Sequence, residues 1–375
     1  MVHTFGLDDA PVPGIARRPV SRISSRTQAL PVDNPSSATK RRVRKGSGRV
    51  TLADVARAAG VAPMTASRAL NSPEIVNLDM VERVRLAVIE TGYVPNLLAG
   101  ALASVRSLLV VIIVPSIAST IYLEFVQSLR AALASKGYQV ILGESDYEHQ
   151  LESSLLDALI ARRPDAIVTV GAVRSEDGRK RLLASAIPVI ETWDLPTDPL
   201  DMVVGFSQAA VGRAAAKYLL GEGHRHVAII STNDDRAAKR AKGFLEAIAE
   251  RAGAPRVESV LIPAPSKLGE GRRALADLLS RPQPPDAVFC TSDMVALGVL
   301  TEARSRGIKV PEELAVMGYG DMNFAADTDP PLTTIRADGK VIGQAAARLI
   351  FDRANAGTTQ NVVDVGFSVV RRASA

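Results

Sequence analysis

The stretch TLADVARAAGVAPMTASRALN, residues 51–71, decides the fold of the N-terminal part of this chain. Apolar residues recur at helical spacing over residues 52–59, which predicts a helix with one buried face, and Thr51 stands at its N-cap position. Gly60 ends this helix and a short turn follows. A second helix begins at Pro63, whose missing N–H costs nothing at a first helical position, and runs to the end of the stretch.

A third amphipathic segment, residues 79–90, follows these two helices and is ended by Gly92. The valines that form its apolar stripe are Val81, Val84 and Val88. Two helices joined by a turn of three or four residues form a unit that inserts its second helix into the DNA major groove. We therefore predict a three-helix, helix-turn-helix DNA-binding head over residues 50–95.

The first residues of the second helix are the ones expected to face base edges, namely Pro63, Met64 and Arg68. Arg68 can donate two parallel hydrogen bonds to guanine, worth roughly 1–3 kcal/mol of discrimination, whereas Pro63 and Met64 offer apolar contact to a thymine methyl. The alternative is that Met64 is a core residue and Arg68 a solvated surface charge. Polar residues that complete the DNA-contacting set, most of them through phosphates, are Thr51, Thr65, Ser67, Asn71 and Asn77.

The rest of the chain alternates strand and helix signals in two series. Apolar runs of the first series are LLVVIIV (108–114), YQVILG (138–143), DAIVTV (165–170) and IPVIE (187–191), with helices expected over 125–135 and 151–161. Those of the second are VAIIS (227–231), VESVLI (257–262), DAVFC (286–290) and LAVMGY (314–319), with helices over 243–252 and up to 279. Continuous apolar strands separated by helices are typical of parallel sheets covered on both faces. The fold class is therefore α/β, with two parallel sheets in a two-lobed body.

A small-molecule site is expected in the cleft between the two lobes, because ligands of open α/β sheets collect beyond the carboxyl ends of the strands. The candidates at those strand ends are Ser116, Tyr122, Trp193, Asp194, Arg240 and Asp293. An aspartate accepts hydrogen bonds from sugar hydroxyls, and an arginine can bind a carboxylate or a pair of hydroxyls. The alternatives are core packing for Trp193 and an N-cap of the following helix for Asp293.

Charge is concentrated at the N-terminus. Residues 1–49 hold 10 Lys or Arg against 3 Asp, whereas the remaining residues hold 35 against 37 Asp or Glu. This segment is rich in Pro, Ser and Arg, so we expect a disordered basic tail, with KRRVRK at 40–45 adding salt-sensitive affinity for phosphates. The alternative is an upstream extension from a misassigned start codon.

The composition also restricts the compartment. Cys290 is the only cysteine, so no intramolecular disulfide can form, which fits a reducing environment. The apolar run 108–114 ends at Pro115, far below the roughly 20 residues that span a bilayer. Without a recognisable signal peptide, we expect a cytoplasmic protein with no membrane partner.

An enzyme is the competing class, because α/β bodies host many chemistries. The four histidines are His3, His149, His224 and His226. No HExxH, CxxC or phosphate-loop motif is present, so we expect no catalytic residues, no metal and no cofactor. A stand-alone sugar-binding receptor is the third possibility, but it would require export and would have no use for residues 50–96.

The quoted head, followed by GYVPN (92–96), resembles the lac repressor/galactose repressor family of bacterial transcription regulators. The similarity continues through GHRHVAII (223–230), CTSDMVALG (290–298), MGYGD (317–321) and PPLTTI (330–335). One departure is Ala62, where family members usually carry a serine that caps the second helix. The resemblance implies a helix-turn-helix head joined to a periplasmic-binding-protein-like body at residues 107–375, with lobe 1 at about 107–205 and 338–363 and lobe 2 at about 206–335 and 364–375.

The resemblance also implies how the parts work together. Residues 96–106 would form a hinge helix on double-stranded operator DNA, Leu102 would insert into the minor groove, and Asn96 and Ala99 would join the contact. The alternative is a flexible linker. The family implies a homodimer, with a tetramer as an open alternative.

By their local motifs, KRAKGF (239–244) and TSDMVALG, Arg240 and Asp293 match the family's effector-binding arginine and aspartate. Gly339 stands where relatives often present a large apolar residue to the effector. The runs PVIETWD (188–194) and MVVGF (202–206) resemble the gluconate-utilisation repressor branch. The expected effector is therefore gluconate or a related sugar acid, with a neutral sugar or a purine as alternatives.

Overall fold

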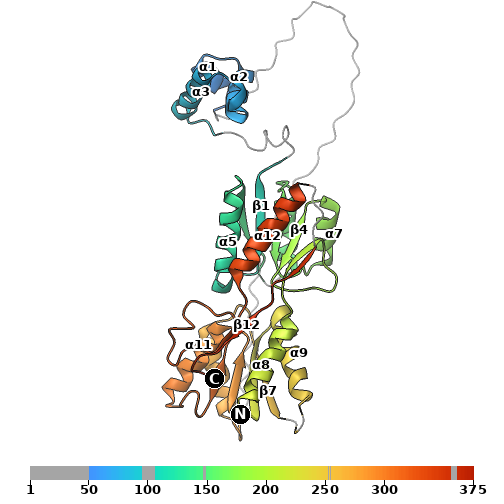
Figure 1. Ribbon diagram of the computed structural model, residues 1–375, viewed down its shortest axis with the longest axis vertical. Helices are drawn as coiled ribbons and strands as arrows, with labels where there is room; N and C mark the ends of the chain where they lie inside the picture. The colour runs from blue at the N-terminus through green and yellow to red at the C-terminus, as the bar shows by residue number, and fades with distance from the viewer. Residues whose placement is uncertain (1–49, 95–105, 147–148, 252, 254, 356–360) are drawn as a thin grey trace, which may run out of the picture. The chain divides into compact units, whose positions relative to one another are not determined.

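The computed structural model describes residues 50–94, 106–146, 149–251, 253, 255–355 and 361–375. The chain divides into two compact units, Met1–Tyr93 and Val94–Ala375 (Figure 1). The first unit contains the helical head, and the second contains an α/β body with parallel sheets. The fold class expected from the sequence is confirmed.

The head consists of α1 (Leu52–Ala59), α2 (Pro63–Asn71), the short 3-10 turn η1 (Pro73–Ile75) and α3 (Leu78–Thr91). Its helix ends follow from local sequence signals. Gly60 and Gly92 follow α1 and α3 with φ angles of +64° and +65°, a left-handed backbone that glycine adopts readily. Ala62 precedes α2 without any side-chain cap, as its lack of a hydroxyl predicts.

Small apolar side chains form the core of the head. Its buried members are Val55, Ala56, Ala59, Ala66, Ala69, Val84 and Ala87, and the predicted valine stripe of α3 packs into it. Arg83 of α3 donates hydrogen bonds to the carbonyl oxygens of Ala59, at 2.5 Å, and Gly60, at 3.1 Å. These bonds satisfy carbonyl groups at the end of α1 and join the third helix to the first.

Lobe 1 of the body is built on a six-stranded parallel sheet in the order β11-β5-β4-β3-β1-β2. The strands are β1 (Leu109–Val114), β2 (Gln139–Glu144), β3 (Ala166–Val170), β4 (Val189–Thr192), β5 (Met202–Gly205) and β11 (Val362–Asp364). The helical segments are η2 (Thr120–Tyr122), α5 (Leu123–Ala134), α6 (His149–Ile160), α7 (Glu176–Ser185) and α12 (Gly339–Ala354). Alternate residues of β1 enter two different cores, one under α5 and α12 and one under α6 and α7, so both faces of the sheet are covered (Figure 1).

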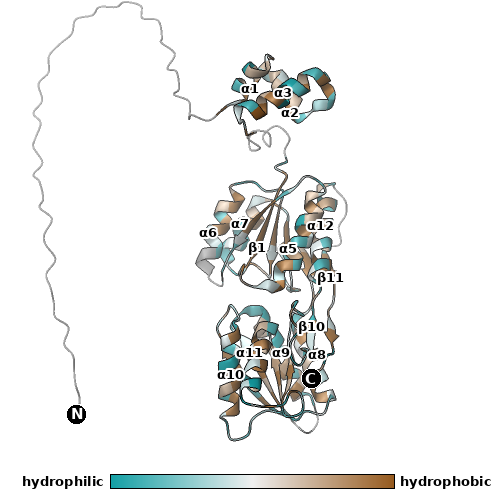
Figure 2. Ribbon diagram, turned by 90° about the vertical axis from the view of Figure 1, so that its left-hand side faces the viewer, coloured by the Kyte–Doolittle hydropathy of each residue, from teal (hydrophilic) through white to brown (hydrophobic). Residues whose placement is uncertain are grey.

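Lobe 2 repeats this plan with a four-stranded parallel sheet in the order β7-β6-β8-β9. Its strands are β6 (His226–Thr232), β7 (Arg256–Ile262), β8 (Ala287–Cys290) and β9 (Ala315–Met317). Its helices are α8 (Gln208–Gly221), α9 (Asp235–Ala249), α10 (Leu268–Leu279) and α11 (Asp293–Ser305). Apolar residues line the central strands of both sheets (Figure 2).

The chain passes between the lobes at three places, which are the links β5–α8, β10–α12 and β11–β12. The strands β10 (Thr334–Arg336) and β12 (Ser368–Val370) pair antiparallel next to two of these links. Each lobe is therefore assembled from segments that are distant in the sequence. This arrangement allows a cleft whose two walls come from different sheets.

One expected helix is wrong at its start, and the error concerns the site. The sequence predicted a helix over 243–252, whereas α9 begins at Asp235. Asp234 caps this helix, because its carboxylate accepts a hydrogen bond from the backbone N–H of Ala237 at 3.0 Å. Arg240 consequently lies inside a helix and not in a loop after β6.

Candidate functional site

The exposed surface of α2 carries the three residues expected to read bases. Pro63 and Arg68 are exposed, and Met64 is 64% exposed. The alternative that Met64 is a core residue is therefore wrong. The exposure of Arg68 fits both a base contact and a solvated surface charge, so its contact with a DNA base stays a prediction.

Several residues expected to contact phosphates form hydrogen bonds within the head. The Thr51 hydroxyl donates to Asp54 at 2.6 Å, so a phosphate would have to compete for that hydrogen. Asn77 caps α3, with its side-chain oxygen accepting from the Asp79 backbone N–H at 2.9 Å. The Asn71 amide donates to the Ser67 hydroxyl at 3.3 Å. Thr65 is half-buried on α2, and Asn96, Ala99 and Leu102 lie outside the described residues.

We predict that Arg68→Ala lowers affinity for a selected operator about tenfold while leaving affinity for scrambled DNA nearly unchanged, because it removes base contacts and few phosphate contacts. Titration of the protein against labelled selected and scrambled duplexes measures the dissociation constant for each. Arg85→Ala is the matched control, because Arg85 lies on α3, is exposed and pairs with Glu82. Equal losses of affinity for the two duplexes would show that Arg68 contacts the DNA phosphates instead of a base.

A cavity of about 130 Å³ lies between the lobes of the body. That space holds on the order of ten water molecules, which suits a small polar ligand. Of the six candidates, Tyr122, Trp193 and Arg240 line it. The cavity wall also includes Thr232, Asp234, Arg236, Lys267 and Tyr319.

Arg240 is held firmly at this wall. It is 5% exposed, donates to the Gln208 side-chain oxygen at 2.6 Å and to the Thr291 carbonyl at 3.1 Å, and its guanidinium carbon lies 4.1 Å from the centre of the Tyr319 ring. Its Nε has no hydrogen-bond acceptor among the described residues. The Nε atom is itself buried, so its missing acceptor is an energetic cost inside the wall.

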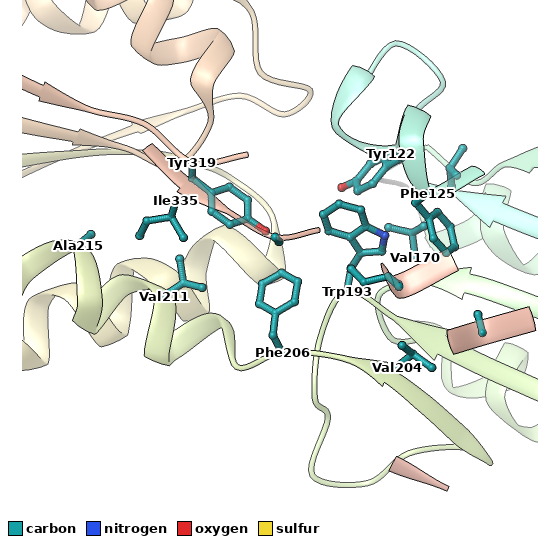
Figure 3. Close-up of a cluster of buried hydrophobic side chains, with 14 of the residues drawn as sticks. Tyr122, Phe125, Val170, Trp193, Val204, Phe206, Val211, Ala215, Tyr319 and Ile335 are labelled. Carbon is teal, nitrogen blue, oxygen red and sulfur yellow. The ribbon is translucent and has the colours of Figure 1, made fainter. Parts of the chain in front are cut away.

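Trp193 is both a core residue and a part of the cavity wall. Its indole is 2% exposed and meets Tyr122 edge to face, with ring centroids 5.2 Å apart and an angle of 84° (Figure 3). Phe125 and Phe206 contact it in the same manner. Burial raises the pKa of the Tyr122 phenol, which therefore stays neutral at physiological pH.

Ser116, Asp194 and Asp293 do not line this cavity. Ser116 is buried in lobe 1, where its hydroxyl accepts a hydrogen bond from the Ala118 backbone N–H at 3.3 Å. Asp194 forms an ion pair with Lys239 and lines a neighbouring cavity of about 200 Å³. Gly339 also lies away from the cavity and packs against the start of α5.

Asp293 lies within lobe 2, where its carboxylate accepts from the Thr334 hydroxyl at 2.6 Å and from the Met322 backbone N–H at 2.7 Å. Burial raises its pKa to about 6. The alternative that Asp293 caps α11 is wrong, because the cap is Ser292 and Asp293 is the first helical residue. In this structure the carboxylate therefore joins two segments of lobe 2, and contact with an effector stays a prediction.

The sequence analysis did not identify Asp234 and Arg236 as cavity residues. The helix that carries this region, α9, begins eight residues earlier than expected. Burial alone would raise the pKa of Asp234, but Arg240, Arg236 and its hydrogen bonds with Thr232 and Ala237 lower it overall. Asp234 is thus ionised at neutral pH. The cavity wall carries the cations Arg236, Arg240 and Lys267 against this single carboxylate.

No group of three or more potential metal ligands occurs in the described part of the chain. The helices of that same part include none that is long and apolar enough to cross a membrane.

This combination of a helix-turn-helix head and a two-lobed binding body defines the class of DNA-binding transcription regulators. Residues 51–96 match the bacterial regulatory proteins of the lacI family, and residues 216–375 match the periplasmic binding protein-like domain. The HTH-type transcriptional regulator GntR of Pseudomonas aeruginosa is 38% identical over 332 residues, covering 88% of this chain and 96% of that protein. The chain therefore belongs to the lacI family and is a transcription regulator, not an enzyme. The match with GntR agrees with the expected gluconate-utilisation branch.

Solved structures agree with this assignment. A LacI family transcriptional regulator from Silicibacter pomeroyi has a TM-score of 0.82 and 31% identity, covering 87% of this chain and 99% of that chain. A complex of the transcriptional regulator CelR with cellobiose has a TM-score of 0.62 and 27% identity, covering 87% and 100%. Both likenesses extend over the head and the body.

Proposed function

We propose that this protein is a cytoplasmic homodimeric repressor whose affinity for a double-stranded operator is controlled by a sugar acid bound between the lobes of the body. The observation that carries the effector class is the charge of the cavity wall, with three cations against one carboxylate. Charged groups taken from water need a partner of opposite sign, so an anionic ligand is favoured over a neutral one. The likeness to GntR supports gluconate or a close relative.

The remaining features of the cavity fit a polyhydroxylated ligand. The Thr232 and Ser292 side chains offer hydrogen-bonding groups at the wall. Trp193 and Tyr122 supply an apolar face against which the carbon chain of a sugar acid can pack. A site of a few polar groups beside aromatic rings is typical of small-molecule recognition.

The proposed regulation couples this cavity to the operator through the lobes. The two walls of the cavity belong to different sheets, so a ligand that contacts both walls changes the equilibrium between lobe arrangements. Lobe 1 follows the head and residues 96–106 in the chain, so a change in this lobe would alter the spacing of two heads in a dimer and thus operator affinity. We expect ligand binding to release DNA.

The second candidate is the same regulator with a neutral sugar as effector. A solved structure of the relative CelR is a complex with cellobiose, and CelR shares 27% identity with this chain. The cation-rich wall argues against a neutral ligand here, because a neutral sugar offers no anionic acceptor for charge-assisted hydrogen bonds with these cations.

Calorimetric titration of the purified chain with gluconate, 2-ketogluconate, 6-phosphogluconate, ribose and a purine tests the proposal. A duplex selected by the protein from a random-sequence pool then serves as operator in a DNA-shift assay with each compound that binds. We expect a sugar acid to bind and to release the duplex. If only ribose or the purine binds, the protein remains a ligand-binding transcription regulator, but the proposal that its effector is a sugar acid is wrong.

A further inference from the structure

Arg236 joins the two lobes at the wall of the cavity. It is the second residue of α9 in lobe 2, and its guanidinium donates to the Val170 carbonyl and to the Tyr122 hydroxyl of lobe 1, each at 2.7 Å. The guanidinium carbon also lies 5.6 Å from the centre of the Tyr122 ring. Arg236 therefore forms direct hydrogen bonds between the walls of the cleft.

The backbone of lobe 1 is shaped to receive this side chain. Gly171 follows β3 with a φ angle of +88°, and a Cβ atom at this position would overlap Arg236 Nη1. A residue with a side chain would be strained there and would displace the guanidinium. The close approach between Arg236 and the end of β3 thus depends on a glycine.

Both acceptors of these two hydrogen bonds are uncharged, since one is a backbone carbonyl and the other a neutral phenol. A carboxylate binds a guanidinium more strongly than either, because its hydrogen bonds are charge-assisted and can be bidentate. Arg236 lines the cavity in which we propose that a sugar acid binds. A ligand carboxylate there would compete with the lobe-1 acceptors for the same N–H groups.

We propose that Arg236 is the residue that selects an anionic effector, and that the ligand carboxylate exchanges with Val170 and Tyr122 as its hydrogen-bond partner. The inference rests on the proposed function, because it assumes that a carboxylate ligand enters this cavity. It goes beyond that function by assigning recognition of the charge to the residue that joins the lobes. The Arg236 side chain then contacts either the ligand carboxylate or lobe 1, so it couples the charge of the ligand to the arrangement of the lobes.

A purely structural role makes a different prediction. If Arg236 only joins the lobes, its replacement shifts the lobe equilibrium and changes the affinity for charged and neutral ligands by the same factor. If it selects the charge, its replacement lowers the affinity for the anion much more than for the neutral compound. The ratio of the two affinities separates these roles.

The test compares gluconate with glucitol, in which a CH₂OH group replaces the carboxylate on the same open chain. We expect the full-length protein to prefer gluconate, and Arg236→Gln to reduce that preference at least tenfold through weaker binding of gluconate. Lys242→Gln is the matched control, because it removes one positive charge from the same helix at a side chain that is 77% exposed. We expect this control to retain the preference of the unmodified protein.

The outcomes separate this inference from the proposed function. If gluconate binds and releases DNA but Arg236→Gln keeps the full preference, the inference is wrong and the proposed function stands. If the unmodified protein binds no carboxylate compound, the proposed effector class fails and the inference falls with it.

A ligand-free measurement checks the hydrogen bonds between the lobes. Trp193 is the only tryptophan and lies against Tyr122 at the cavity wall, so its fluorescence reports on the cleft. We expect acrylamide to quench Trp193 more strongly in Arg236→Gln than in Lys242→Gln. Equal quenching in the two variants would contradict the role of Arg236 in joining the lobes.

Discussion

Replacement of Arg240 by alanine should leave operator binding intact and weaken effector binding about 100-fold. The guanidinium lies at the cavity wall over Tyr319, and its hydrogen bonds to Gln208 and Thr291 fix its orientation. Loss of a hydrogen bond to a charged group costs about 1.5–3 kcal/mol, which corresponds to roughly 10- to 150-fold in affinity. Titration of the effector and a DNA-shift assay with and without it measure the two properties separately.

The control for this prediction is Arg213→Ala. Arg213 lies on α8 of the same lobe, pairs with Glu246 and Glu250, and does not line the cavity. We expect this variant to bind and respond like the unmodified protein. A normal effector response from Arg240→Ala would show that the ligand site is not at this wall.

Replacement of Gly212 by alanine should destabilise the body by about 3 kcal/mol, at the upper end of the range for overpacking. A Cβ atom at this position would overlap the carbonyl oxygen of Arg240 and contact the backbone nitrogen of Phe244 at 2.8 Å. Both atoms belong to the α9 backbone, which cannot move aside like the end of a flexible side chain. Gly212 lies on α8, so α8 and α9 would have to separate, and the part of the cavity wall on α9 would move as well.

Gly221→Ala provides the matched control on the same helix. Gly221 is the last residue of α8, and a Cβ atom there meets nothing within 4 Å. We expect this variant to be unchanged or slightly more stable, because alanine is the better helix former. Denaturant unfolding followed by circular dichroism compares the variants, and equal midpoints for both would contradict close packing of α8 against α9.

The architecture was accessible to prediction because its signals are local. The glycines after α1 and α3, the proline at the start of α2 and the spacing of small apolar residues define the head within about forty residues. The apolar runs of the body likewise became parallel strands. Helices α7, α8 and α12 were not anticipated, since their apolar spacing was not identified in the sequence.

The candidate site was less accessible, and Asp293 shows why. Its motif matched the expected effector-binding aspartate, yet its carboxylate accepts hydrogen bonds from Met322 and from Thr334, 41 residues away along the chain. Ser116 and Asp194 also follow strands of lobe 1, but neither lines the cavity with Tyr122 and Trp193. A position after a strand predicts the edge of a sheet, but it does not predict the direction of a side chain.

The sequence by itself determined the class of this protein, because helix caps, turn residues and apolar periodicity act over a few neighbouring residues. Only the tertiary structure decided which charges meet in the cleft. Arg236 contacts partners 66 and 114 residues away, and it reaches them because the chain passes between the lobes and the strand order places the ends of β3 and η2 opposite α9. Such contacts depend on the packing of whole lobes, so no local pattern in the sequence encodes them.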